Sequence, residues 1–93
     1  MEEQDLLADF FAAIENDARI SITHIGIYSA VLRYWQLAGR ANPFPAYSYQ
    51  IIKIAKISAK TYHKIIRDLS AYGYLRYEPS FKRNQASRVF LLI

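Results

Sequence analysis

The first hydrophobic pattern in the chain covers residues 4–17 and has helical spacing. Its apolar members fall at positions i, i+1, i+4, i+5 and i+8, which places them on one face of an amphipathic helix. They are Leu6, Leu7, Phe10, Phe11 and Ile14. Acidic residues lie largely off this face, and those near its start suit the positive end of the helix dipole. We predict an interaction helix whose apolar face packs on its own chain or pairs with its copy in a homodimer.

The second pattern predicts a helix from Thr23 to about Ala38, in which apolar residues surround the axis instead of forming one stripe. A helix of this kind is covered on more than one side. We expect Thr23 to be its N-cap and Gly39 to be its stop. His24, close to the helix start, is expected to be a hydrogen-bonding residue at the surface.

A proline-containing segment, residues 40–48, comes next. Pro43 and Pro45 exclude a helix there, because proline lacks an N–H and restricts the residue before it. Residues 46 and 47 can form a short strand, and Ser48 can cap a brief helix that ends near Ala55.

The helix with the clearest limits follows a turn at residues 56–58. Ser58 stands at the N-cap position, and the helical pattern continues to Tyr72. Gly73 occupies the position after the helix end, where glycine adopts the left-handed conformation most easily.

Two strands complete the pattern. Residues 74–77 alternate as a strand does until Pro79 ends them, residues 88–93 form the second strand, and residues 80–87 make a polar loop between the two. The fold class is therefore mainly α with a small antiparallel β-sheet (α+β). Residues 1–93 make a single domain, in which residues 1–19 add a helix to residues 20–93, whose elements have the order of a winged helix-turn-helix.

Charge is distributed unevenly along these elements. Residues 1–22 contain six acidic residues and one arginine, whereas residues 23–93 contain eleven lysines or arginines and two acidic residues. A basic body indicates a polyanionic partner, and the alternative is ordinary solvated surface. The chain has no cysteine, which excludes disulfides and cysteine–zinc sites.

The helix at residues 58–72 has two opposite faces. One is apolar, with Tyr62, Ile65, Ile66 and Leu69. A helix fits the major groove, and helix-turn-helix proteins read base edges with the N-terminal part of their second helix. We therefore predict a recognition helix that binds DNA through Lys60, Thr61, His63, Lys64 and Arg67. The alternative is a solvated face on a structural helix.

The loop between the two strands is expected to be the wing, beside the neighbouring groove or the backbone. Basic side chains neutralise phosphates there, and side-chain amides donate hydrogen bonds to them. The residues predicted to contact DNA from the wing and from the turn before the recognition helix are Lys53, Lys56, Lys82, Arg83, Asn84 and Arg88.

Residues 57–76, ISAKTYHKIIRDLSAYGYLR, resemble the second half of winged helix-turn-helix domains of bacterial regulators. The family's pattern is matched at Ile57, Ser58, Thr61, Tyr62, Ile65, Ile66, Leu69, Gly73, Tyr74 and Leu75. More narrowly, the stretches THIGIYSAVLRYWQLAG, NPFPAYS and KTYH are similar to small winged-helix proteins of bacterial mobile elements and phages, including replisome-organiser-type N-terminal domains.

The resemblance implies sequence-specific binding of double-stranded DNA. It also implies a small transcriptional regulator or an accessory factor of a mobile element or of replication. The alternative is a protein–protein interaction module on the same scaffold, because a fold alone does not determine a function.

Other classes of function have no support in the sequence. There is no glycine-rich loop for a phosphate and no pair of carboxylates for catalysis, so we expect a protein that is not an enzyme. The two histidines, His24 and His63, lie on different helices, so we expect neither a metal nor a cofactor, and no small-molecule ligand is evident.

No stretch is long and apolar enough for a membrane span, and Met1 is followed by acidic residues, which leads us to expect a cytoplasmic protein. Most of the eight tyrosines are expected in the core or at its rim. An exposed tyrosine can also stack on a single-stranded base.

Overall fold

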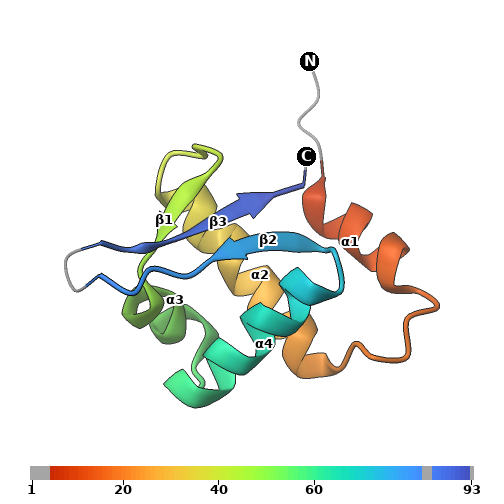
Figure 1. The fold of residues 1–93 in the computed structure, drawn as a ribbon. Coiled ribbons are helices and arrows are strands. Elements are labelled where there is room, and N and C mark those ends of the chain that lie inside the picture. The colour runs from red at the N-terminus through yellow and green to blue at the C-terminus, as the bar shows by residue number, and fades with distance from the viewer. Residues whose placement is uncertain (1–4, 83–84, 93) are drawn as a thin grey trace.

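Helices and strands follow one another in the predicted order in a computed structural model that describes residues 5–82 and 85–92 (Figure 1). These described elements are α1 (Leu6–Ile14), α2 (Ile22–Leu37), β1 (Phe44–Ala46), α3 (Ser48–Ala55), α4 (Ala59–Ala71), β2 (Leu75–Glu78) and β3 (Ser87–Leu91). The predicted class, mainly α with a small antiparallel sheet, is confirmed. From α2 onward the layout is that of a winged helix-turn-helix, and α1 precedes it as an additional helix.

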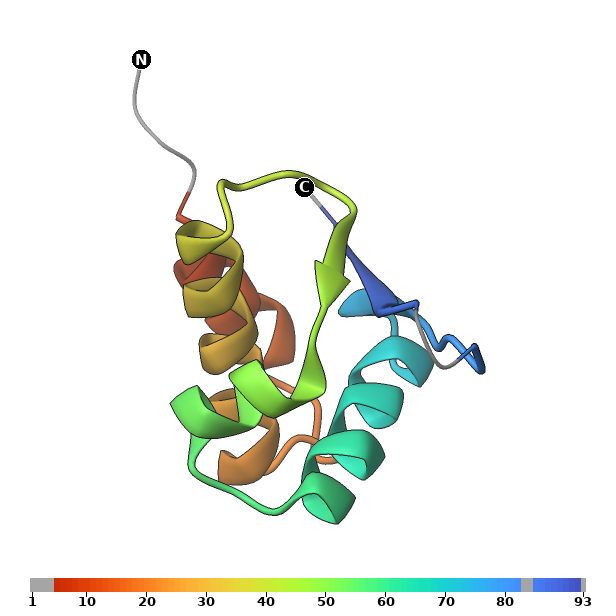
Figure 2. The ribbon, with the colours of Figure 1, turned by 90° about the vertical axis from the view of Figure 1, so that its left-hand side faces the viewer.

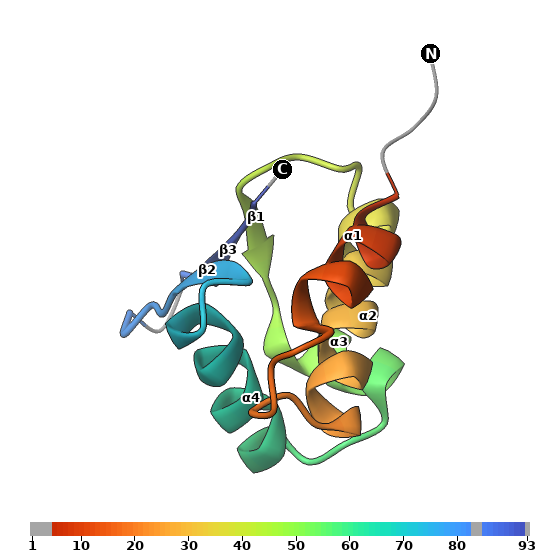
Figure 3. The same cartoon turned by 90° about the vertical axis from the view of Figure 1, so that its right-hand side faces the viewer.

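The three strands form an antiparallel sheet in the order β1–β3–β2. The register pairs Phe44 with Val89 and Leu75 with Leu91, and all four side chains are buried. Residues at alternate positions of the strands, such as Arg88, therefore lie on the outer face of the sheet. Figures 2 and 3 show α1 and α2 on one side of the core and α4 on the other.

α2 is the central helix and contacts α1, α3 and α4. Its buried residues include Ile27 and Val31 on one face and also Ala30 and Leu32, which point to opposite flanks of the helix. The prediction that this helix is covered on more than one side is confirmed.

The N-cap predicted for α2 is wrong. Ser21, not Thr23, caps the helix, because Ser21 has an extended backbone and its hydroxyl accepts the N–H of His24. In return, Nδ1 of His24 accepts the N–H of Ser21 at 3.0 Å, which completes a capping box. Thr23 already lies within the first turn.

The cap at the start of α4 is confirmed, whereas the cap of α3 is not. Ser58 accepts the N–H of Thr61 at 3.2 Å and begins α4. In α3 the N-cap residue is Tyr47, which makes no side-chain cap bond, and Ser48 is the first helical residue.

The strand predicted at residues 46 and 47 is instead β1, Phe44–Ala46, with Pro45 inside it. Proline is tolerated there because β1 is an edge strand of the sheet. The two later strands shift by about one residue, β2 beginning at Leu75 and β3 at Ser87.

α1 is shorter than the predicted helix at residues 4–17. It begins after Asp5, whose carboxylate accepts the N–H of Ala8 at 3.0 Å, and it ends at Ile14. Asp17 lies beyond the helix because its carboxylate accepts the N–H of Arg19 at 3.0 Å, in a local turn that competes with helical bonding.

The apolar face of α1 packs on its own chain (Figure 3). The Phe10 ring stacks on Tyr28 with centroids 3.9 Å apart and meets Tyr74 edge to face at 5.5 Å. Leu6 and Phe10 are buried, Leu7 and Ile14 are half-buried, and Phe11 is 48% exposed. Of the two predicted uses of this face, packing within the chain is therefore the one that is observed.

The packing of α1 can be tested by replacing the buried Phe10 and, as a control, its exposed neighbour Phe11. Phe10→Ala should lower the free energy of unfolding by about 3–5 kcal/mol, because it removes a buried ring. Phe11→Ala should lower it by less than about 1 kcal/mol. Urea unfolding followed by circular dichroism measures both, and equal midpoints for the two variants would contradict the docking of α1.

Two glycines should respond to alanine with opposite signs. Gly73 follows α4 with φ at +87°, so Gly73→Ala should cost about 1–2 kcal/mol through backbone strain alone, since a Cβ there meets no atom within 4 Å. Gly26 lies inside α2 with equally open space, so Gly26→Ala should gain about 0.5–1 kcal/mol from helix propensity. Thermal unfolding of the pair measures this difference, and destabilisation by both changes would refute the assignment.

Candidate nucleic-acid interface

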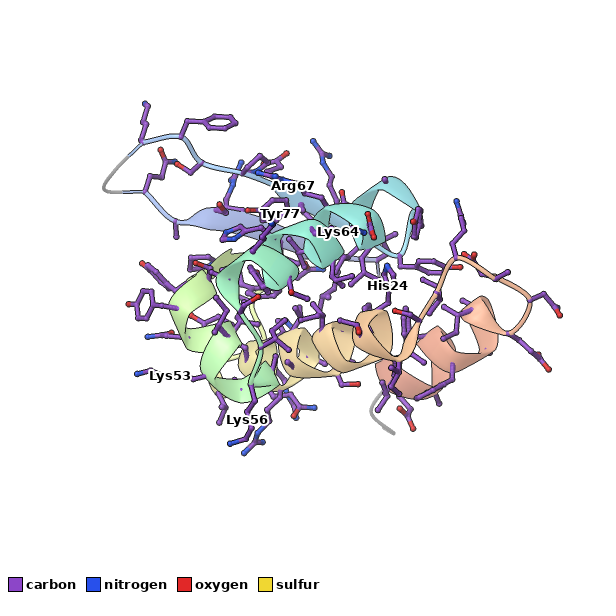
Figure 4. All side chains as sticks on the ribbon, turned by 90° about the horizontal axis from the view of Figure 1, so that it is seen from below. His24, Lys53, Lys56, Lys64, Arg67 and Tyr77 are labelled. Carbon is purple, nitrogen blue, oxygen red and sulfur yellow. The ribbon has the colours of Figure 1, made fainter. Side chains whose placement is uncertain are left out.

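α4 divides its surface between core and solvent as predicted. The inward residues are 0–5% exposed, and they are Tyr62, Ile65, Ile66 and Leu69. Lys60, Lys64 and Arg67 are exposed on the opposite side. Figure 4, which looks onto this side from below, shows Lys64 and Arg67 along α4.

A buried polar chain joins α4 to α2. Nε2 of His24 lies 2.9 Å from a carboxylate oxygen of Asp68, and the histidine is only 5% exposed. Because Nδ1 accepts the backbone N–H of Ser21, the proton of the neutral ring is on Nε2 and is donated to Asp68. His24 does form hydrogen bonds, but the prediction that it lies at the surface is wrong, because it reaches from α2 across to α4 (Figure 4).

Asp68 also accepts a hydrogen bond from the ammonium group of Lys64. Nζ lies 3.1 Å from the same carboxylate oxygen that binds His24. The hydrogen bond from His24 holds the pKa of Asp68 below its usual value, and the bond from Lys64 acts in the same direction, while partial burial opposes them. The outward face of α4 therefore contains one carboxylate beside its cations.

Two other predicted base-reading residues already have partners within the chain. The hydroxyl of Thr61 accepts a hydrogen bond from the hydroxyl of Ser58 at 3.0 Å. The Nδ1 of His63 lies 2.8 Å from the carbonyl oxygen of Ala59, so Nδ1 is the donor. Both side chains are half-buried, whereas Lys60, Lys64 and Arg67 are exposed.

The lysines of the turn flank α4. Lys53 is in the last turn of α3, and Lys56 ends α3 in the left-handed conformation with φ at +59°. Figure 4 shows both on one side of α4, while Arg67 lies on the side nearer the sheet. Within residues 5–82 and 85–92, no ion pair is formed by Lys53, Lys56, Lys60 or Arg67.

The base of the wing is held by Ser87. Its hydroxyl oxygen accepts a hydrogen bond from the backbone N–H of Ser80 at 3.1 Å and another from the hydroxyl of Tyr77 at 3.3 Å. Lys82, farther along the wing, is exposed. The predicted contacts Arg83 and Asn84 lie outside the described residues.

Arg88 is not brought together with α4. It lies on the outer face of the sheet, where its guanidinium is 2.8 Å from Glu78, and Glu78 also binds Arg76 at 2.7 Å. A phosphate contact by Arg88 would therefore be made from a different face of the protein and would compete with Glu78.

An ion pair after α1 was not predicted from the sequence. Arg19 binds Asp17 at 2.8 Å, and its guanidinium lies 4.1 Å from the centre of the Tyr72 ring. Tyr74 also donates a hydrogen bond to Asp17. The hydrogen bonds from Arg19 and Tyr74 also lower the pKa of Asp17. Through the contacts of Asp17 with Tyr74 and of Arg19 with Tyr72, the segment after α1 is joined to the end of α4.

The hydrogen bond between His24 and Asp68 was also not predicted from the sequence. Two local signals were present: His24 stands three residues after a capping serine, and Asp68 stands four residues after Lys64. Neither signal indicates that the two residues meet, because they are 44 positions apart.

Comparisons with protein-family models, with curated proteins and with solved structures find no match for this chain. Among the described residues, no helix combines the length and apolar character needed to cross a membrane. In the same part of the chain, no group of three or more histidine or acidic residues could hold a metal ion.

The charge of Asp68 should stabilise the fold in a pH-dependent way. Because its folded pKa is lowered, its contribution is present above the unfolded value of about 3.9 and is lost as pH falls through the folded value. Asp68→Asn should therefore have a lower free energy of unfolding than the wild type near pH 7, and this gap should narrow as pH falls below about 3.9. Urea unfolding across this range measures the gap.

Glu15→Gln is the matched control, since Glu15 is exposed after the end of α1. Its stability should stay within about 0.5 kcal/mol of the wild type near pH 7. An Asp68→Asn gap that persists unchanged in acid would show that the carboxylate charge has no part in anchoring α4.

Proposed function

We propose that this protein binds double-stranded DNA and that α4 enters the major groove. The observation that carries the proposal is the outward face of α4, where Lys60, Lys64 and Arg67 are exposed on a helix whose other side is in the core. A major groove is wide enough for a helix, and lysine and arginine bind the edge of guanine there.

The position of each cation along α4 suggests its role. Lys60 lies in the first turn and Lys64 one turn later, in the part of the helix that reads base edges in helix-turn-helix proteins. Arg67 lies farther along, and Lys53 and Lys56 precede the helix, so these three are assigned to phosphates. Lys82 would reach the backbone from the wing.

The charges elsewhere in the basic body support the same partner. Residues 23–93 contain only two acidic residues, Asp68 and Glu78. Asp68 is bound to His24 and Lys64, and Glu78 is bound between two arginines. Cations without an acidic partner favour a polyanion, whose counterions are released when the phosphates are neutralised.

A role as a small transcriptional regulator, or as an accessory factor of a mobile element or of replication, stays a prediction from the resemblance. A homodimer, predicted from the apolar face of α1, also stays a prediction. A protein-interaction module is the second candidate. The observation that favours it is a pocket of about 400 Å³ between α2 and α3, lined by Tyr34, Leu37 and Ile54 together with two other residues. Leu37 is 63% exposed at this pocket.

Salt titrations should separate base reading from phosphate binding. Lys82→Gln should weaken binding to every duplex alike and make the slope of log affinity against log salt shallower by about 0.9. Lys60→Gln should cost about 1–3 kcal/mol on the sequence selected from a random duplex library, and much less on random duplex. Fluorescence anisotropy on both DNAs measures these differences.

Arg40→Gln is the matched control for loss of one positive charge. The loop between α2 and β1 lies at the far end of the molecule from the start of α4 (Figures 1 and 2). Arg40 belongs to this loop. Its replacement should leave the salt slope unchanged. If Lys60→Gln weakens binding to both DNAs equally, Lys60 binds phosphate instead of a base. If the wild type binds but no variant changes the affinity, α4 and the wing are not the DNA-binding surface. If the wild type binds neither DNA at low salt, DNA binding is refuted and the protein-interaction role takes its place.

A further inference from the structure

A pocket of about 460 Å³ lies between the start of α3, the first turns of α4 and the base of the wing. Four tyrosines contribute to its walls, and they are Tyr47, Tyr49, Tyr62 and Tyr77. His63 adds a fifth ring from α4. We call this the tyrosine pocket, and its volume is in the range of pockets that hold small ligands.

The rim of the tyrosine pocket presents aromatic faces to solvent. Tyr47 is 42% exposed and Tyr49 is 59% exposed, and their ring centroids are 5.9 Å apart at an angle of 59°. Neither ring is therefore needed to fill the core. Exposed aromatic rings of this kind are platforms on which a planar ring can stack.

The lining of the tyrosine pocket is polar but carries no formal charge. Besides the five rings it contains three serines, a glutamine and two alanines, and none of the described lining residues is a lysine, an arginine or an acid. A phosphate or a carboxylate would find no counter-charge there. An uncharged ligand with hydrogen-bonding groups would find several partners.

One residue that lines the tyrosine pocket has a buried hydroxyl without a hydrogen-bond partner in the described part of the chain. Tyr62 is 1% exposed, and its hydroxyl has no hydrogen-bond partner among the described residues. Burial raises the pKa of this phenol, so the hydroxyl keeps its proton and can donate it. A buried hydroxyl without a partner is unfavourable and is commonly satisfied by a ligand or by water.

His63 supplies the complementary group. Its Nδ1 donates to the carbonyl of Ala59, so in the neutral ring Nε2 is an acceptor. Its ring also contacts Tyr62 edge to face, with centroids 5.2 Å apart. The tyrosine pocket thus offers both hydrogen-bond donors and acceptors beside aromatic surfaces.

We propose that the tyrosine pocket binds a nucleobase, an uncharged planar ring with donors and acceptors along its edge. The base would be presented either by an unpaired nucleotide of bound DNA or by a free nucleoside. The first source rests on the proposed function, because α4 and the wing, which form two walls of the pocket, are the elements assigned to DNA. The second source does not depend on duplex binding.

The first experiment compares three fluorescent DNAs: a perfect duplex, the same duplex with one unpaired adenosine, and the same duplex with an abasic unit at that position. The wild type should bind the unpaired adenosine about tenfold more tightly than the abasic unit, which is the order expected of one base–aromatic stack. Tyr49→Leu should abolish this preference, whereas Tyr49→Phe should keep it.

Phe81→Ala is the control for non-specific stacking. Phe81 is 92% exposed on the wing and does not line the tyrosine pocket, so its loss should leave the preference unchanged. All three variants should bind the perfect duplex as the wild type does. A preference lost in Phe81→Ala but kept in Tyr49→Leu would place the stack on the wing and overturn the proposal.

The second experiment titrates adenosine alone into the wild type and follows the backbone amides by NMR. The amides of Tyr47, Gln85 and Ser87 should shift, and Tyr49→Leu should remove the shifts. If duplex binds but the unpaired base gives no advantage and adenosine shifts nothing, the tyrosine pocket is not a base site and the proposed function stands. If adenosine shifts these amides but no duplex binds, the proposed function fails and the pocket remains a nucleoside site.

Discussion

The structure depends on α4 being buried along one side and exposed along the other. Tyr62, Ile66 and Leu69 are at most 1% exposed in a core shared with α2, α3 and the sheet. A rotation of α4 by one position, about 100°, would bring cations toward that core. An unpaired charge in such a place is strongly destabilising, so the apolar side of the helix determines which side chains face outward.

The bond between His24 and Asp68 adds a specific anchor to this non-specific packing. Both ring nitrogens of His24 have partners, which makes the burial of a polar ring tolerable. The anchor also has an electrostatic consequence, because it places a carboxylate beside Lys64 on the basic side of α4. The fold is thereby secured at the expense of some positive potential on that side.

The order of the elements, the Ser58 cap and the glycine after α4 could be predicted because each depends on neighbouring residues. The division of α4 into two faces follows from helical periodicity alone. The burial of His24 could not be predicted, because its partner Asp68 is distant in sequence. Pro45 was predicted only to exclude a helix, and its place inside β1 could not be predicted, because proline is tolerated in a strand only at an edge such as the one β1 occupies.

The candidate site also has features that could be predicted from neighbouring residues and features that could not. The exposed cations of α4 follow from the pattern, whereas the position of Arg88 depends on which face of the sheet it occupies, which the strand register decides. The tyrosine pocket is formed by segments that are far apart in the chain, so no local motif could indicate it. The exposure of Tyr47 and Tyr49 could not be predicted either, because tyrosines are found both in cores and at surfaces.

The sheet has few backbone groups to offer to another molecule. One edge strand, β1, has three residues, and its Pro45 has no N–H. Just beyond it, the side-chain amide of Asn42 bonds both the N–H and the carbonyl of Leu91 at 2.8 Å, where an additional pair of strand residues would otherwise meet. The other edge, β2, carries the charges of Arg76 and Glu78. Short, charged and capped edges of this kind resist strand-to-strand aggregation, so copies of the protein at high concentration would meet through side chains and not through a shared sheet.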